Sequence, residues 1–376
     1  MKGQSNPFVI SGYEGVAYFC DRIEETAQMA SEIANGNNIA LIATRRMGKS
    51  GLIEHYFSQS QVQAQYYTFF VDIYDTQSLS ELILRLSREI LMRLKPFGRR
   101  ALDSFWQTVH SLQTGISFNP MGEPSFNLQI GQINEPSVSL DEIFRYLEIA
   151  DKPCIVAIDE FQQINKYPEK NIEATLRTYV QHCHNAQFIF SGSQRHTMSA
   201  MFTNASRPFF QSVSIMHLEA IDIDAYDLFA KALFAKGNRS LADGVTKAVY
   251  ELSHGITWYT QKLFNTLYAH TAEGTTCVPD DVAEALEYII KTQSYSYEEL
   301  LFRLPERQKQ VLIALAKSGP TKSITSASFL QANALPSASM VQSAVRGLLE
   351  KDYITLFHGV YSVYDLFLDY WIQREL

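Results

Sequence analysis

One stretch of the sequence sets the architecture expected of this chain: Asn38-Ile39-Ala40-Leu41-Ile42-Ala43-Thr44-Arg45-Arg46-Met47-Gly48-Lys49-Ser50. Its apolar first half is typical of a buried strand, and a helical pattern begins at Gly51. A Gly-Lys-Ser turn between a strand and a helix is typical of a phosphate-binding loop, in which main-chain N–H groups and a helix N-terminus hold phosphates. We therefore predict a nucleoside-triphosphate site here.

The residues of this loop have separate expected roles. Lys49 is expected to reach the terminal phosphates, and Ser50 to ligate magnesium. The other residues expected to line the nucleotide are Thr44, Arg45, Arg46, Met47, Gly48 and Gly51. The usual pattern is G-x-x-x-x-G-K-[ST], and Ala43 stands where its first glycine belongs. The motif is therefore imperfect when taken alone.

A second stretch completes the pattern: Cys154-Ile155-Val156-Ala157-Ile158-Asp159-Glu160. A buried strand that ends in two acidic residues can deliver Asp159 to a metal ion and Glu160 toward an attacking water. The alternative is two unrelated buried strands, with Lys49 an ordinary surface lysine. The strand before the loop, the helix after it and the Asp-Glu pair together favour the nucleotide site.

The composition indicates a folded protein of two or three domains. Of the 376 residues, 46% are hydrophobic and 12% aromatic, which is ample for packed cores. No apolar run reaches the roughly 18 residues that span a bilayer, and the N-terminus lacks the apolar stretch of a secretory signal. The four cysteines are scattered along the sequence, which fits free thiols in a reducing compartment better than a disulfide framework. We expect a cytoplasmic protein with no membrane partner.

The charge is unevenly distributed along the chain. The net charge of −8 argues against general nucleic-acid binding by the whole protein. From Leu301 to the C-terminus, however, basic residues outnumber acidic ones. A weakly basic C-terminal module on an acidic body is compatible with nucleic-acid contact.

Apolar strands alternate with helices through the first part of the chain. Further strands are expected at residues 66–73, 188–193 and 213–218, with helices between them. This alternation predicts an α/β fold in which a parallel sheet is wound on both faces. A ligand then belongs at the C-terminal ends of the strands, where Gly48, Asp159 and Ser193 fall.

Two helix starts and one β-hairpin are also predicted within this region. Ser78-Leu79-Ser80-Glu81 opens an amphipathic helix that runs through Leu94. Residues 115–133 alternate around a Pro-Met-Gly-Glu-Pro break, which predicts a β-hairpin inserted into the domain. Ser139-x-x-Glu142 predicts a capping box at the start of the helix that precedes the Asp-Glu strand.

The pattern changes twice after residue 220. Residues 221–295 are helical throughout, which fits either plain packing or a lid over the nucleotide. Helices at 305–317, 326–332 and 339–351, followed by a hairpin turning at His358-Gly359, predict a winged helix-turn-helix. The expected domains are thus a P-loop domain at 1–220, a helical lid at 221–295 and a winged helix at 296–376.

These motifs resemble those of bacterial and archaeal P-loop ATPases related to replication-initiator (AAA+) and STAND-type signalling ATPases, in particular a group common in Bacteroidetes. The resemblance covers essentially the whole chain. It rests on residues 18–22, 45–50, 158–161 and 190–193 and on the C-terminal winged helix. It implies an AAA+-like sheet, a helical lid, and ATP and Mg2+ as cofactors.

The resemblance also implies roles for residues outside the two main motifs. Ser193 or Gln194 matches the sensor position that polarises water or the γ-phosphate. Arg207 precedes the fifth strand, where such ATPases often place an arginine finger that acts on a neighbouring subunit; the alternative is a surface arginine. Gly255-Ile256-Thr257 has threonine where many relatives carry proline, and no lid arginine stands out as a second sensor. These departures favour slow hydrolysis or a nucleotide-dependent switch.

Three functions remain open at this point. The first is an ATPase or ATP-gated switch whose nucleotide state positions the C-terminal module. The second is a DNA-binding regulator in which ATP is structural, and the third is a protein-interaction scaffold in which the winged helix binds another protein. A homo-oligomer also stays open. The candidate recognition helix is expected to present Ser339, Gln342, Ser343 and Arg346 outward, a face poor in cations for DNA contact.

Overall fold

The computed structural model describes residues 6–94, 99–111, 116–118, 124–126 and 135–376. The chain forms two compact units. The first is Ser11–Asp222, and the second combines Ile223–Leu376 with the N-terminal residues up to Ile10. Within the described ranges, none of the helices is long and apolar enough to cross a membrane.

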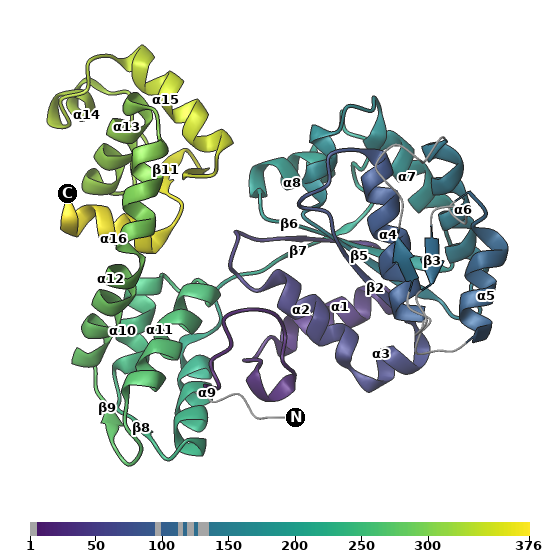
Figure 1. The fold of residues 1–376 in the computed structure, drawn as a ribbon, viewed down its shortest axis with the longest axis horizontal. Helices are drawn as coiled ribbons and strands as arrows, with labels where there is room; N and C mark the ends of the chain where they lie inside the picture. The colour runs from purple at the N-terminus through teal and green to yellow at the C-terminus, as the bar shows by residue number, and fades with distance from the viewer. Residues whose placement is uncertain (1–5, 95–98, 112–115, 119–123, 127–134) are drawn as a thin grey trace. The chain divides into compact units, whose positions relative to one another are not determined.

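The first unit contains a five-stranded parallel sheet (Figure 1). Its strands in chain order are β1 (Ile39–Ile42), β2 (Tyr67–Asp72), β5 (Cys154–Asp159), β6 (Ala186–Gly192) and β7 (Ser214–His217). Their order across the sheet is β2-β5-β6-β1-β7, and every pairing is parallel. The predicted α/β fold is confirmed. Because β6 lies between β1 and β5, the ends of the strands that carry the two motifs are separated by one strand only.

Both faces of this sheet are buried along its central strands β5, β6 and β1. Phe69, Val156 and Phe188 belong to one large apolar core with residues of the helices on their side. The alternate residues of the strands, such as Ile155 and Ile189, are also fully buried, on the opposite face. A sheet covered on both faces explains why its strands are continuously apolar in the sequence.

Helices lie on both sides of the sheet in Figure 1. Those that contribute to the large core are α4 (Leu79–Leu94), α5 (Arg99–Thr108), α6 (Pro136–Ile149), α7 (Ile172–His182) and α8 (Arg195–Thr203). The others in this unit are α1 (Ile23–Ala34), α2 (Lys49–Ser58) and α3 (Ser60–Gln65), with short 3-10 turns η1 (Val16–Tyr18) and η4 (Phe161–Lys166). Helices alternating with parallel strands give the winding expected from the sequence.

Of the two helix starts predicted from local sequence, the one at Ser78 is confirmed and the one at Ser139 is not. The start of α4 is as predicted, with the Glu81 N–H donating to Ser78 Oγ at 3.3 Å. The capping box at Ser139 is wrong because α6 begins at Pro136, which places Ser139 inside the helix. Ser139 Oγ and Glu142 Oε2 instead lie 2.8 and 2.6 Å from Ser111 Oγ, so they hold the segment after α5.

The predicted hairpin at 115–133 falls largely outside the described residues. Two short strands within it are described, β3 (Ile116–Phe118) and β4 (Pro124–Phe126). They pair antiparallel, with Ile116 opposite Phe126.

The second unit begins with a helical bundle that also takes in the N-terminal arm. Its helices are α9 (Ile223–Lys236), α10 (Val245–Ser253), α11 (Thr257–His270) and α12 (Asp280–Arg303), with a short parallel pair β8 (Ser240–Leu241) and β9 (Thr276–Cys277). Phe8 is fully buried and stacks on Phe264 at a centroid distance of 5.3 Å. Asn265 Nδ2 donates to the Phe8 carbonyl at 2.8 Å. The arm is thus an integral part of this bundle.

A winged helix follows in the same unit. It consists of α13 (Glu306–Ser318), α14 (Ala327–Ala332), α15 (Ala338–Glu350) and an antiparallel hairpin of β10 (Ile354–Phe357) and β11 (Val360–Val363). The final helix, α16 (Leu366–Glu375), was not expected from the sequence. Trp371 of α16 donates to Ser294 Oγ of α12 at 2.9 Å, so the chain ends against the helix that leads into the winged helix.

Asp369 of α16 gives a pH-dependent prediction. Burial raises its pKa from 3.8 to about 6, although a hydrogen bond from Gln373 opposes the shift. Ionising this carboxyl therefore costs more in the folded protein than in the unfolded chain, so the free energy of unfolding falls as pH rises through this interval. We expect Asp369→Asn to gain roughly 1 kcal/mol relative to wild type between about pH 4 and pH 7, a value reduced for partial solvent exposure.

The measurement is urea unfolding of wild type and Asp369→Asn at both pH values. The quantity that matters is the change with pH in the stability difference between the two proteins, because the substitution itself adds a constant offset. A difference that stays constant across this interval would contradict the prediction.

Candidate functional site

The loop between β1 and α2 has the backbone conformation that its sequence suggests. Gly48 precedes α2 with φ of 91°, in the left-handed region that glycine adopts without strain. Arg46 also has a positive φ, of 68°. The Met47 carbonyl accepts a hydrogen bond from Arg22 Nη2 at 3.4 Å. The result is a strand–loop–helix connection whose helix begins at Lys49.

Lys49 is a buried cation at the start of this helix. Only 6% of the residue is exposed, and its ammonium donates to the Ala43 and Thr44 carbonyls, each at 3.2 Å. Burial lowers the pKa of Lys49, and the nearby Asp159 and Glu160 carboxylates oppose that effect. An anion beside this ammonium and the helix N-terminus would offset the cost of burying the charge.

The Asp-Glu end of β5 lies against the first turn of α2. Asp159 Oδ2 accepts from Ser50 Oγ at 2.6 Å, and Asp159 Oδ1 accepts from Ser191 Oγ of β6. Two oxygen groups that suit a hard cation, one hydroxyl and one carboxylate, therefore adjoin each other. They come from the two motifs that the sequence analysis paired.

Ser193 joins the loop to Glu160. Its Oγ donates to Glu160 Oε2 at 2.7 Å and accepts from Arg45 Nε at 3.0 Å. Gln162 Nε2 donates to the same carboxylate oxygen. Of the two sensor candidates, Ser193 contacts Glu160, whereas Gln194 precedes α8 and its Oε1 accepts from Thr197 Oγ1 at 3.4 Å. Three strand ends are thus connected through Arg45, Ser193 and Glu160.

Two acidic side chains beside this cluster were not predicted from the sequence. Asp72 ends β2 directly opposite Asp159 in the sheet register, and burial raises its pKa. Glu54 of α2 also has a pKa raised by burial, with Asp159 adding to the shift. The position of Asp72 at the end of a predicted strand could have identified it, whereas Glu54 carried no signal beyond its helical spacing from Ser50.

Two glycines in this region differ in what they require. A Cβ on Gly192 would lie too close to Gln162 Oε1 and Met198 Sδ, so both of these side chains would have to shift to admit it. A Cβ on Gly51 would lie 3.8 Å from the Phe19 ring, which is ordinary contact. Gly51 lies in the first turn of α2 as predicted, and sterically an alanine would fit there.

The structure does not bring Arg207 to the cluster around Glu160. Its guanidinium forms an ion pair with Glu173 of α7, and Nη2 donates to Asn165 Oδ1 at 2.6 Å. Burial raises the pKa of Glu173, and Arg207 lowers it. Arg207 therefore has a packing role within its own unit, and its role as an arginine finger stays a prediction.

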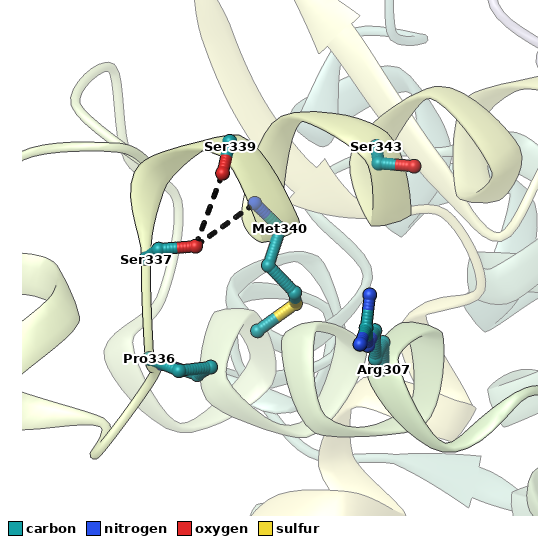
Figure 2. A pocket seen from close by; sticks show the side chains of 6 residues that line it. All are labelled: Arg307, Pro336, Ser337, Ser339, Met340 and Ser343. Carbon is teal, nitrogen blue, oxygen red and sulfur yellow. Dashed lines mark hydrogen bonds between the residues drawn. The ribbon is translucent and has the colours of Figure 1, made fainter.

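The winged helix carries a separate polar hollow of about 310 Å³ (Figure 2). Its lining residues are Arg307, Pro336, Ser337, Ser339, Met340 and Ser343. Ser337 Oγ accepts from the Met340 N–H at 3.3 Å, at the start of α15. The predicted outward face of this helix is confirmed, since Ser339, Gln342, Ser343 and Arg346 are all at least partly exposed.

Comparisons with known proteins bear on the fold. A family model described as a probable winged helix domain matches residues 295–374, which confirms that prediction. The solved structure of the Walker-type ATPase paby2304 of Pyrococcus abyssi is similar, with a TM-score of 0.66, 18% identity and coverage of 98% of this chain and 99% of that one.

Two Aeropyrum pernix structures are similar over similar lengths. The ORC2 protein in ADPNP and ADP complexes has a TM-score of 0.56 and 12% identity, over 99% of this chain and 98% of that one. The ORC1 protein in complex with DNA has a TM-score of 0.55 and 11% identity, over 99% and 97%. A comparison with curated protein sequences gave no significant match. At the level of fold, the resemblance to replication-initiator ATPases is confirmed, whereas the STAND subtype and the Bacteroidetes grouping stay predictions.

Proposed function

We propose that this protein binds ATP with Mg2+ in the cytoplasm and hydrolyses it slowly, as a nucleotide-dependent switch. The observation that carries the proposal is the buried Lys49 ammonium at the start of α2, next to the Ser50–Asp159 hydrogen bond. A buried cation, a helix N-terminus and an adjoining pair of oxygen ligands form a set of groups that suits a triphosphate and its metal ion.

Ser50 and Asp159 are the residues that would hold magnesium. Among the described residues, no group of three or more His, Cys, Asp or Glu side chains is placed to bind a metal ion. A cation here would therefore take further ligands from phosphate oxygens and water, as Mg2+ in nucleotide sites does. Bound Mg2+ would supply charge neutralisation on the phosphates, which Lys49 supplements from the loop.

Glu160 is the proposed general base. Its carboxylate is oriented by donors from Ser193 and Gln162, which fix the oxygen that would accept a proton from water. Arg45, which donates to Ser193, belongs to the loop expected to line the nucleotide. Contact between Arg45 and phosphate would compete with this hydrogen bond. We therefore infer that nucleotide binding alters how Ser193, and through it the Glu160 carboxylate, is held in place.

The test of this function combines titration with turnover on one sample. The protein is titrated with a fluorescent ATP analogue, and ATP hydrolysis is then measured across the fractions of a size-exclusion run, with Mg2+ and with EDTA. We expect micromolar or tighter binding and slow, Mg2+-dependent turnover that follows the protein peak. Absence of binding would overturn the proposal, and binding without turnover would remove its enzymatic part.

Arg207 provides a prediction that separates packing from catalysis. Arg207→Ala leaves the Glu173 carboxylate, whose side chain is 10% exposed, without its cationic partner. We expect a loss of roughly 1–3 kcal/mol in the free energy of unfolding, the usual cost of a stranded buried polar group. The double variant Arg207→Ala/Glu173→Gln should recover most of this loss, as measured by urea unfolding.

Turnover of the stable double variant then decides the role of Arg207. An arginine finger contributes roughly 10³-fold or more to the rate, so if Arg207 is a finger, the double variant should turn over ATP more slowly than wild type by a factor of that size. The turnover of the wild-type protein per subunit should also rise with protein concentration. Wild-type turnover in the double variant would leave Arg207 as a packing residue only.

A second candidate function is DNA contact through the winged helix. The observation in its favour is the polar face of α15 with Arg346, beside the hollow to which Arg307 contributes; the similar ORC1 structure is a complex with DNA. The full chain should then bind duplex DNA in a salt-dependent manner. Arg307→Ala/Arg346→Ala should flatten the salt dependence, by about 0.9 in log–log slope for each phosphate that is no longer neutralised. Lys236→Ala on α9 is the control.

A further inference from the structure

Helix α12 carries a stripe of three exposed aromatic side chains, of which Tyr288 also contacts the His270 ring of α11 at a centroid distance of 4.6 Å. Tyr288, Tyr295 and Phe302 are 52%, 76% and 86% exposed. They are spaced by seven residues, and positions seven apart on an α-helix lie within about 20° of each other around its axis. The three rings therefore form one line along the helix. Exposed aromatic residues aligned in this way usually mark an interaction site.

The other sides of α12 are already occupied within its own unit. The buried residues of the helix include Leu286, Ile289 and Ile290. On the side of α16, Ser294 accepts from Trp371 and Glu287 pairs with Arg374. The aromatic stripe is thus a separate face, bordered by the exposed charged side chains of Lys291, Glu298, Glu299 and Arg303.

The charges beside the stripe point to a particular occupant. If two copies of α12 cross antiparallel at Tyr295, then Tyr288 of one copy faces Phe302 of the second copy. Lys291 and Glu298 lie on the same side of the stripe, so Lys291 then faces Glu298 of the second copy, and by symmetry this pair occurs twice. Glu299, on the other side of the stripe, faces the neutral Thr292 of the second copy. In a parallel pair, Glu298 of one copy would face Glu299 of the other, which opposes like charges.

We propose that this protein self-associates through an antiparallel pair of α12 helices centred on Tyr295. A twofold axis through Tyr295 makes the surface self-complementary, as a closed dimer requires. Fully buried aromatic side chains cover about 150–250 Å² each, and these three are partly covered already. The interface therefore falls at or below the roughly 1,200 Å² of weak complexes, and we expect a dissociation constant of roughly 10–1,000 µM.

The first test is sedimentation velocity of the full-length protein over a concentration range that brackets this interval. Wild type should move from monomer toward dimer as concentration rises. Tyr295→Lys should remain monomeric, because it places two ammonium groups opposite each other at the centre. The control is Leu228→Lys on α9, which removes another exposed apolar side chain (71% exposed) away from the stripe and should dimerise like wild type.

The second test is a charge exchange that fixes the orientation. Lys291→Glu and Glu298→Lys should each weaken dimerisation about tenfold, because each places like charges opposite each other at two symmetric positions. The double variant Lys291→Glu/Glu298→Lys should dimerise nearly as well as wild type. A parallel pair, or a stripe that binds a different protein, would not show this loss and recovery.

The outcomes that would overturn the proposal are distinct from failure of the nucleotide site, since α12 contributes none of its residues. A wild-type protein that stays monomeric over the whole range would overturn it. Undiminished dimerisation of Tyr295→Lys would also overturn it, as would absence of recovery in the charge-exchanged variant. Capture of another protein by the stripe without self-association would assign the stripe to that partner instead.

Discussion

Lys49→Ala is expected to weaken ATP binding by at least about 30-fold and to abolish turnover. The ammonium is buried at the start of α2 and donates to two loop carbonyls, so the variant loses the cation best placed for the terminal phosphates. Removing one partner from a buried charged hydrogen bond typically costs 2–5 kcal/mol, roughly 30- to several-thousand-fold in affinity. Titration with a fluorescent ATP analogue measures the change directly.

The control for Lys49→Ala must separate lost binding from a disturbed loop. Lys166→Ala removes an exposed lysine from η4 in the same unit and should bind ATP like wild type. The urea unfolding transition of Lys49→Ala should also stay cooperative, which shows that the sheet is intact. If Lys49→Ala binds ATP with wild-type affinity, the phosphate site is not where we place it.

Local sequence patterns were sufficient to predict the sheet and several of the polar residues that lie together at its edge. Strands buried on both faces are continuously apolar, as in Cys154–Asp159, so their position and parallel pairing follow from the pattern and its alternation with helices. The grouping of the polar side chains follows from where they stand at the ends of these strands. Parallel strands bring their C-terminal ends to one edge, which is why Ser50, Asp159 and Ser193 could be paired before their contacts were known.

What the sequence did not predict depends on contacts between distant segments. Asn265 donates a hydrogen bond to the carbonyl of Phe8, although the two residues lie far apart in the sequence. No local pattern indicates that the N-terminal arm inserts into the helical bundle. Ser139 matches a capping-box pattern, yet it bonds to Ser111 because α6 begins three residues earlier. The ion pair of Arg207 with Glu173 is another contact between distant segments that no local pattern predicts. An arginine before a strand suggests a finger, but only the fold shows which carboxylate it reaches.

Glu160→Gln is expected to retain ATP affinity and to lower turnover by roughly 10²–10⁴-fold, the usual contribution of a general base. The amide has nearly the same size and can still accept a hydrogen bond from Ser193 through its oxygen, so the connection between β5 and β6 is retained. It cannot accept a proton from water at neutral pH. Single-turnover hydrolysis with the enzyme in saturating excess over ATP measures this step without a contribution from binding.

Ser193→Ala serves as the comparison that tests how Glu160 is held. It removes the Ser193 donor to the Glu160 carboxylate and leaves the Gln162 donor in place. The proton acceptor itself is unchanged, so turnover should fall less than in Glu160→Gln, by about tenfold for a hydrogen bond worth roughly 1–1.5 kcal/mol. If Glu160→Gln hydrolyses ATP like wild type, Glu160 is not the base. A Ser193→Ala deficit as large as that of Glu160→Gln would move the essential role to Ser193, since a hydroxyl that merely positions the carboxylate cannot account for a loss of that size.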